Sequence, residues 1–89
     1  MGHLVYRERF VGIDVSRSHF EVAMYPHPIA CRFDDTPSGH DIAVQELASY
    51  APKLIAVGSC GGDETNLVAA LEACHLCVAV INPCKARMF

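Results

Sequence analysis

The chain lacks several features that mark specialised classes of protein. It has no tryptophan, and its longest uninterrupted apolar run covers only residues 76–81. A membrane-spanning helix needs about 20 such residues, so we expect no membrane partner. No charged segment followed by an apolar one opens the sequence, which excludes a secretory leader and predicts a cytoplasmic protein.

Basic residues are also scarce. Seven Lys and Arg stand against ten Asp and Glu, which gives a formal net charge of −3. A protein that binds nucleic acid by itself usually has a basic excess, because neutralising phosphates supplies much of its affinity. The charge therefore predicts either a ligand other than nucleic acid or a nucleic-acid-binding part that lies outside this sequence.

Cysteine is present in a pattern that favours neither disulfides nor zinc. The five cysteines are an odd number without a secretory leader. Cys74 and Cys77 form a C-x-x-C pair with His75 and Cys84 nearby, but a closed zinc site commonly takes its four ligands from two such pairs. We expect free thiols that fill small apolar spaces.

The hydrophobic content of 52% is that of a folded chain, and its first half has the period of β-strands. Apolar and polar residues alternate over residues 10–15, 20–25 and 29–33. Short turns separate these segments, which predicts a three-stranded antiparallel meander. Residues 1–9 show no clear period and are expected to form a flexible N-terminus.

The second half changes to the period of a helix. Ser38 followed by Asp41 resembles a capping box, and Pro52 is a stop signal. The apolar stripe expected between them consists of Ala43, Val44, Leu47, Ala48, Tyr50 and Ala51.

A strand, a helix and a second strand should follow. Residues 53–57 suit a buried strand, and a glycine-rich loop over residues 58–62 leads to a helix capped by Gly62 or Asp63. The apolar side of that helix is expected to contain Leu67, Val68, Leu71 and Cys74. With a last strand over residues 76–81, this half predicts a βαβ unit with parallel strands and a right-handed crossover. The whole chain is therefore expected to be an α/β domain with a five-stranded mixed sheet.

Two polar features should meet at one end of the sheet. Asp14 lies near the carboxyl end of the first strand, and the glycine-rich loop follows the fourth strand. Neighbouring parallel strands would bring both to the end where open α/β sheets bind ligands. Asp14 is then either a ligand-binding carboxylate or a solvated residue that caps the turn at Ser16. Gly61 and Gly62 either allow a tight entry into the helix or cradle an anion at its N-terminus.

Three segments resemble, in order, one family of recombinases. Residues 11–17, VGIDVSR, are similar to the opening VGIDVSK of DEDD-type transposases of the Piv/MooV class, the insertion-sequence 110 family. Residues 54–71, LIAVGSCGGDETNLVAAL, resemble the family block VVLEATGGYE…LVAAL. Residues 78–89, VAVINPCKARMF, resemble VAVVNPRQVRDFA.

The resemblance implies an RNase H-like, RuvC-like domain over residues 10–89. In complete family members four acidic residues bind Mg²⁺, a separate C-terminal domain supplies a serine nucleophile, and DNA and often a guide RNA are the partners. Clustered carboxylates suit this chemistry because Mg²⁺ prefers oxygen ligands. Paired metal ions can then stabilise both the attacking and the leaving oxygen.

Only one of the four acidic positions has a counterpart here. Asp14 matches the first, the glutamate position falls on Gly58, and the aspartate pair would follow Phe89. We therefore expect a truncated N-terminal part of a transposase, without the C-terminal helices, that holds Mg²⁺ at most weakly and is inactive alone. The residues expected to contact nucleic acid are Ser16, Arg17, Gly61 and Gly62.

Two other interpretations stay open. Actin-like sugar kinases and chaperone ATPases share this type of sheet and also begin with a strand that bears Gly-x-Asp. The chain would then be half of a nucleotide-binding domain, although residues 17–19 make a poor phosphate-binding hairpin. The third interpretation is a non-catalytic module that self-associates through the sheet face that a helix covers in relatives.

Overall fold

The computed structural model describes residues 8–26, 29–59 and 64–81. Their elements, in chain order, are β1 (Phe10–Val15), β2 (His19–Tyr25), β3 (Ile29–Asp34), α1 (Pro37–Tyr50), β4 (Leu54–Gly58), α2 (Thr65–Ala73) and β5 (Val78–Ile81). The predicted order of three strands, helix, strand, helix and strand is confirmed. No strand boundary differs from its predicted position by more than two residues.

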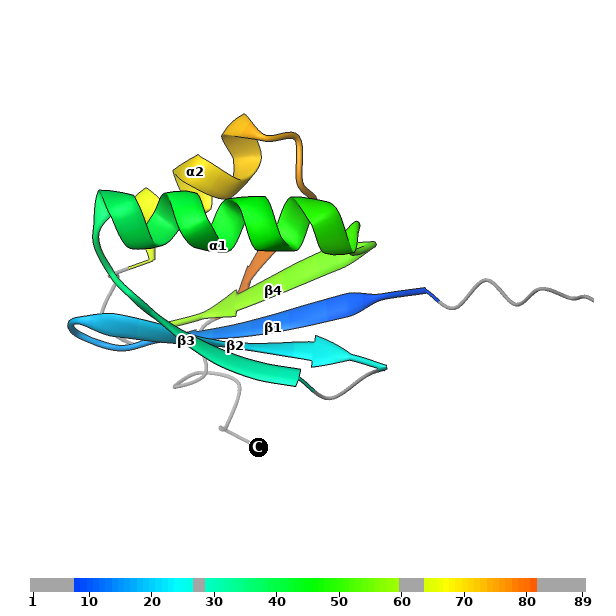
Figure 1. The fold of residues 1–89 in the computed structure, drawn as a ribbon, viewed down its shortest axis with the longest axis horizontal. Coiled ribbons are helices and arrows are strands. Elements are labelled where there is room, and N and C mark those ends of the chain that lie inside the picture. The colour runs from blue at the N-terminus through cyan, green and yellow to red at the C-terminus, as the bar shows by residue number, and fades with distance from the viewer. Residues whose placement is uncertain (1–7, 27–28, 60–63, 82–89) are drawn as a thin grey trace, which may run out of the picture.

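The strands form one mixed sheet in the order β3-β2-β1-β4-β5. β2 is antiparallel to both β1 and β3, whereas β4 is parallel to both β1 and β5, so the predicted meander and parallel unit are confirmed. Figure 1 shows α1 and α2 on the same face of this sheet. α1 connects β3 to the parallel strand β4, and α2 connects β4 to the parallel strand β5. Both connections move in the same direction across the sheet, so two crossovers of the same handedness place their helices on the same face. In the part of the chain that the structure describes, no helix covers the other face, which we call the open face.

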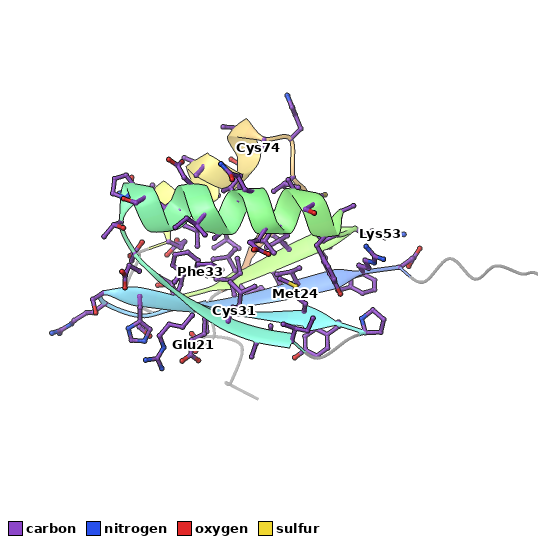
Figure 2. All side chains as sticks on the ribbon, in the orientation of Figure 1. Glu21, Met24, Cys31, Phe33, Lys53 and Cys74 are labelled. Atoms are coloured by element: carbon purple, nitrogen blue, oxygen red, sulfur yellow. The ribbon has the colours of Figure 1, made fainter. Side chains whose placement is uncertain are left out.

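The hydrophobic core lies between the sheet and the two helices. In β1 the residues at alternate positions, Val11, Ile13 and Val15, are buried beneath α1 and α2. Phe33 also lies on this side, where its ring stacks on that of Phe20 with the ring centroids 5.5 Å apart, whereas Glu21 points away from the helices (Figure 2). The largest fully buried side chains are Phe20, Leu47, Ile55, Leu67, Leu71, Val22 and Val57.

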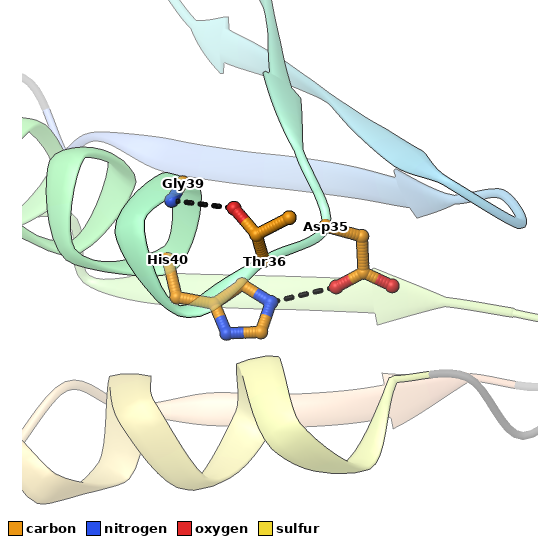
Figure 3. A network of polar contacts seen from close by, with 4 residues as sticks. All are labelled: Asp35, Thr36, Gly39 and His40. Atoms are coloured by element: carbon orange, nitrogen blue, oxygen red, sulfur yellow. Dashed lines mark hydrogen bonds and ion pairs between the residues drawn. The ribbon is translucent and has the colours of Figure 1, made fainter.

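The N-cap residue of helix α1 is Thr36, two residues before the predicted cap at Ser38. The Thr36 hydroxyl accepts a hydrogen bond of 3.1 Å from the backbone N–H of Gly39 (Figure 3). Pro37 follows as the first helical residue, where its fixed φ suits a helix and its missing N–H costs nothing. The predicted capping box at Ser38 and Asp41 is therefore wrong, because an extended threonine before a proline is the better start.

The first turn of α1 is packed tightly onto the end of β3. An added Cβ at Gly39 would overlap the backbone carbonyl of Asp34, so only glycine fits at this close approach. The imidazole of the next residue, His40, is buried and its Nε2 lies 2.6 Å from Oδ1 of Asp35 (Figure 3). The same ring contacts Phe20 at a centroid distance of 5.8 Å, which joins this polar pair to the core.

The predicted apolar stripes of both helices are too long. In α1, Ala48 is exposed, and Ala51 lies outside the helix in a left-handed conformation with φ 54° just before Pro52. In α2, Cys74 is the C-cap residue and is exposed. Helical period alone does not show where a helix ends, and both Ala51 and Cys74 lie after the last helical residue.

The carboxyl end of α1 is held by the residue that precedes β1. The Arg9 guanidinium donates a hydrogen bond of 2.9 Å to the carbonyl of Tyr50 and lies 5.1 Å from the centre of the Tyr50 ring. The Tyr50 hydroxyl in turn donates to the carbonyl of Tyr25 at 2.7 Å. A cation at this position also interacts favourably with the helix dipole.

Candidate functional site

Asp14 lies on the open face, where two other strands supply its neighbours. It is exposed and is directed away from the buried residues of β1, as predicted. Its register partner on the parallel strand β4 is Gly58, so the predicted neighbourhood of β1 and β4 is confirmed. Its partner on the antiparallel strand β2 is Glu21. Asp14 thus has a carboxylate on one side and a residue without a side chain on the other.

Glu21 is a site residue that we did not predict. Its Oε2 accepts a hydrogen bond of 2.7 Å from the guanidinium of Arg32, its register partner on β3. This bond and the positive charge of Arg32 lower the pKa of Glu21, with a smaller contribution from His19. Counting residue pairs outward from the turn at 16–18 would have placed Glu21 opposite Asp14, because the register of a hairpin follows from its turn.

The turn that follows Asp14 holds two of the predicted nucleic-acid contacts. The backbone N–H of Ser16 donates to the carbonyl of His19 at 2.8 Å and closes the hairpin between β1 and β2. Arg17 is exposed at this turn. The other two predicted contacts, Gly61 and Gly62, lie outside the residues that the structure describes, as does the predicted cap at Asp63.

A shallow hollow of about 520 Å³ occupies the open face beside Asp14. Each of the five strands places Gly or Ala in the same register row, and the first four residues of this row line the hollow. In strand order from β3 to β5, the residues of this row are Ala30, Ala23, Gly12, Ala56 and Ala79. Asp14, Glu21, Tyr25 and Ile81 are among the residues that line the hollow. The hollow therefore has an apolar floor and a carboxylate pair at one end.

The described residues offer little to a metal ion. Among residues 8–26, 29–59 and 64–81, no three His, Cys, Asp or Glu side chains are grouped so as to hold one. Asp14 and Glu21 supply two carboxylates, and Arg32 already occupies one oxygen of Glu21. Mg²⁺ bound there would keep most of its ligands as water, and such binding is weak.

The cysteines that the structure describes are free thiols. Cys74 and Cys77 are both exposed, so the expectation that they fill apolar spaces is wrong, whereas Cys31 is half-buried. Cys74 caps the carboxyl end of α2, and Cys77 lies just before β5. Cys60 and Cys84 lie outside the described residues.

The chain matches no model of a known protein family, and no curated protein matches it. Neither helix of the described part is long and apolar enough to cross a membrane. A functional assignment therefore depends on the three resembling segments and on the geometry of the sheet around Asp14.

Proposed function

We propose that the chain is an RNase H-like domain that corresponds to the N-terminal, RuvC-like part of a DEDD-type transposase. The observation that carries the proposal is the position of Asp14 beside Gly58 on the parallel strands β1 and β4. These residues match the first and second acidic positions of the family, and the two resembling segments that contain them are adjacent in space. The strand order β3-β2-β1-β4-β5 agrees with the fold that the resemblance implies.

The same register explains why the domain should not cleave DNA alone. A carboxylate at position 58 would stand next to Asp14, where both could ligate one cation. Glycine supplies no ligand there, and Glu21, on the other side of Asp14, is paired with Arg32. The proposed role is therefore that of a catalytically inactive domain of a DNA transposition protein. Arg17, exposed at the end of the hairpin, is available to contact a backbone phosphate.

The test restores the missing ligand. In Gly58→Glu we expect Mg²⁺ to bind at least about ten times more tightly than in the unmodified chain, because two adjacent carboxylates then share the ion. The measurement is a Mg²⁺ titration followed by the amide resonances around Asp14. The gain in Mg²⁺ affinity should disappear in the double variant D14N/G58E.

Ala56→Glu is the matched control, since it adds a carboxylate on the same strand and face but in the register row of Gly12. It should not bring the gain in affinity. A gain in G58E that persists without Asp14, or one that A56E shows equally, would contradict the proposal. A rise in melting temperature with ATP would also contradict it and would favour the nucleotide-binding interpretation.

A further inference from the structure

We infer that the outer edge of β5, which pairs with no strand among the described residues, pairs with β5 of a second copy, so that the chain forms a weak symmetric dimer with a continuous sheet. This inference does not depend on the proposed function. It rests on a difference between the two edge strands, β3 and β5.

The edge at β3 carries charge, which discourages pairing with another strand. Arg32 and Asp34 lie at alternate positions of β3, and Arg32 is mostly exposed. Charged side chains on an edge strand protect it, because a neighbouring strand would have to desolvate them. The segment after β3 also turns at once into α1.

Among the described residues, the strand β5 itself carries no charged side chain. Its four residues are Val78, Ala79, Val80 and Ile81. Val80 is 55% exposed and Ile81 44%, and the two side chains lie on opposite faces of the strand. Within the described residues β5 is hydrogen-bonded to a strand on its β4 side only. Unpaired backbone groups beside exposed aliphatic side chains are a template for another strand.

A second copy fits this edge because the four side chains of β5 are uncharged. An antiparallel β5–β5 pair has a twofold axis, so each residue type meets itself or another aliphatic residue across the contact. The two copies of Asp14 then lie about 24 Å apart, five strand spacings, and do not repel each other strongly. Stacking the open faces instead would bring the central strands of two copies together, with Asp14 near its symmetry mate. Charge therefore favours the edge over the open face for a second copy.

The surroundings of Val80 limit the strength of this dimer. A cleft of about 300 Å³ beside α2 is lined by Val80, Glu64 and Glu72. Both glutamates line this cleft with Val80 in each copy, and in the proposed dimer they would repel those of the second copy, so salt that screens them should tighten the dimer by roughly twofold. Four-residue strands bury less than the roughly 1,200 Å² of a standard interface, and we expect a dissociation constant between about 10 µM and 1 mM.

The experiment measures sedimentation and amide resonances from about 2 µM to about 2 mM protein, a range that spans the expected dissociation constant. We expect a concentration-dependent dimer, with the resonance shifts centred on β5. Val80→Lys should raise the dissociation constant at least about tenfold, since an edge lysine opposes pairing. In the monomer, the ammonium group of the lysine introduced at position 80 has the carboxylates of Glu64 and Glu72 nearby. Ile81→Lys repeats the test from the other face of β5.

Two lysine variants elsewhere separate the possible contacts. Ile42→Lys changes an exposed position of α1, 56% exposed, and should leave the dimer intact. Gly12→Lys fills the hollow of the open face, and an added Cβ there meets no atom within 4 Å, so the monomer tolerates it. It should also leave the dimer intact. Loss of the dimer in G12K but not in V80K and I81K would overturn the inference, as would a wild-type chain that stays monomeric throughout the range.

Discussion

The two faces of the sheet come from the same strands but have opposite characters. In β1, Val11 and Ile13 are buried against the helices, while Gly12 and Asp14 between and beside them lie on the open face. The covered face holds the fully buried aliphatic and aromatic residues. The open face holds a row of Gly and Ala, with the exposed side chains of Phe10, Tyr25 and Leu54 on one side of the row and Asp14, Glu21 and Arg32 on the other. One face therefore supplies most of the stability, and the other is left for contacts with ligands. Four paired substitutions test this division.

The largest difference is expected between two leucines. Leu47 of α1 is fully buried on the covered face, whereas Leu54 of β4 lies on the open face and is 37% exposed. Leu47→Ala should lower the free energy of unfolding by about 3 kcal/mol because it leaves a cavity. Leu54→Ala should cost no more than about 1 kcal/mol. Urea denaturation measures the free energy of unfolding of both variants. Equal losses would show that side chains on the open face are packed as tightly as those on the covered face.

Two glycines should differ nearly as much. At Gly39 an added Cβ overlaps the Asp34 carbonyl, while at Gly12 it meets nothing within 4 Å. We expect Gly39→Ala to cost about 2 kcal/mol despite the better helix propensity of alanine, because the backbone of β3 or α1 must move. Gly12→Ala should be neutral or stabilise by up to about 1 kcal/mol, since the unfolded chain loses freedom. Their melting temperatures give the comparison, and a tolerated G39A would disprove the close approach.

The start of α1 gives a smaller effect. Thr36→Ala removes the hydroxyl that accepts from the Gly39 N–H and should cost about 1 kcal/mol. Ser38→Ala changes a hydroxyl residue two positions later, inside the first turn, and should cost less than about 0.5 kcal/mol. Thermal denaturation of the two variants decides between the observed cap and the capping box that the sequence suggests. The reverse order of effects would favour Ser38 as the cap.

The smallest effect concerns the ion pair on the open face. Arg32 lowers the pKa of Glu21 below its ordinary value of 4.5, so the pair stabilises the folded chain above that pH. The contribution is lost as the pH falls through the lowered pKa, and it is small because both side chains are more than half exposed. Arg32→Ala should raise the pKa of Glu21 towards 4.5, as measured by NMR titration of its carboxylate. Arg17→Ala, a matched change in the nearby turn, should leave that pKa where it is.

Much of the fold follows from local pattern. The alternation around Val11 and Ile13 identifies β1 and places Asp14 on the opposite face, because successive strand residues point in opposite directions. Pro52 marks the end of α1 for an equally local reason, since proline removes a helical hydrogen bond. The details that depend on two distant segments are harder to predict. Ala48 and Cys74 fit a helical stripe by their spacing but are exposed in the folded chain.

The candidate site likewise has features that follow from local sequence and features that depend on distant segments. The sequence by itself determined that a carboxylate follows a glycine near the end of the first strand and that a glycine-rich loop follows the fourth, since both are properties of short segments. Only the tertiary structure decided that Gly58 lies beside Asp14 on the parallel strand and that, among the described residues, β5 pairs with a strand on one side only. Register and strand order arise from the geometry of turns and crossovers, which join residues far apart in the chain, and no local period records them.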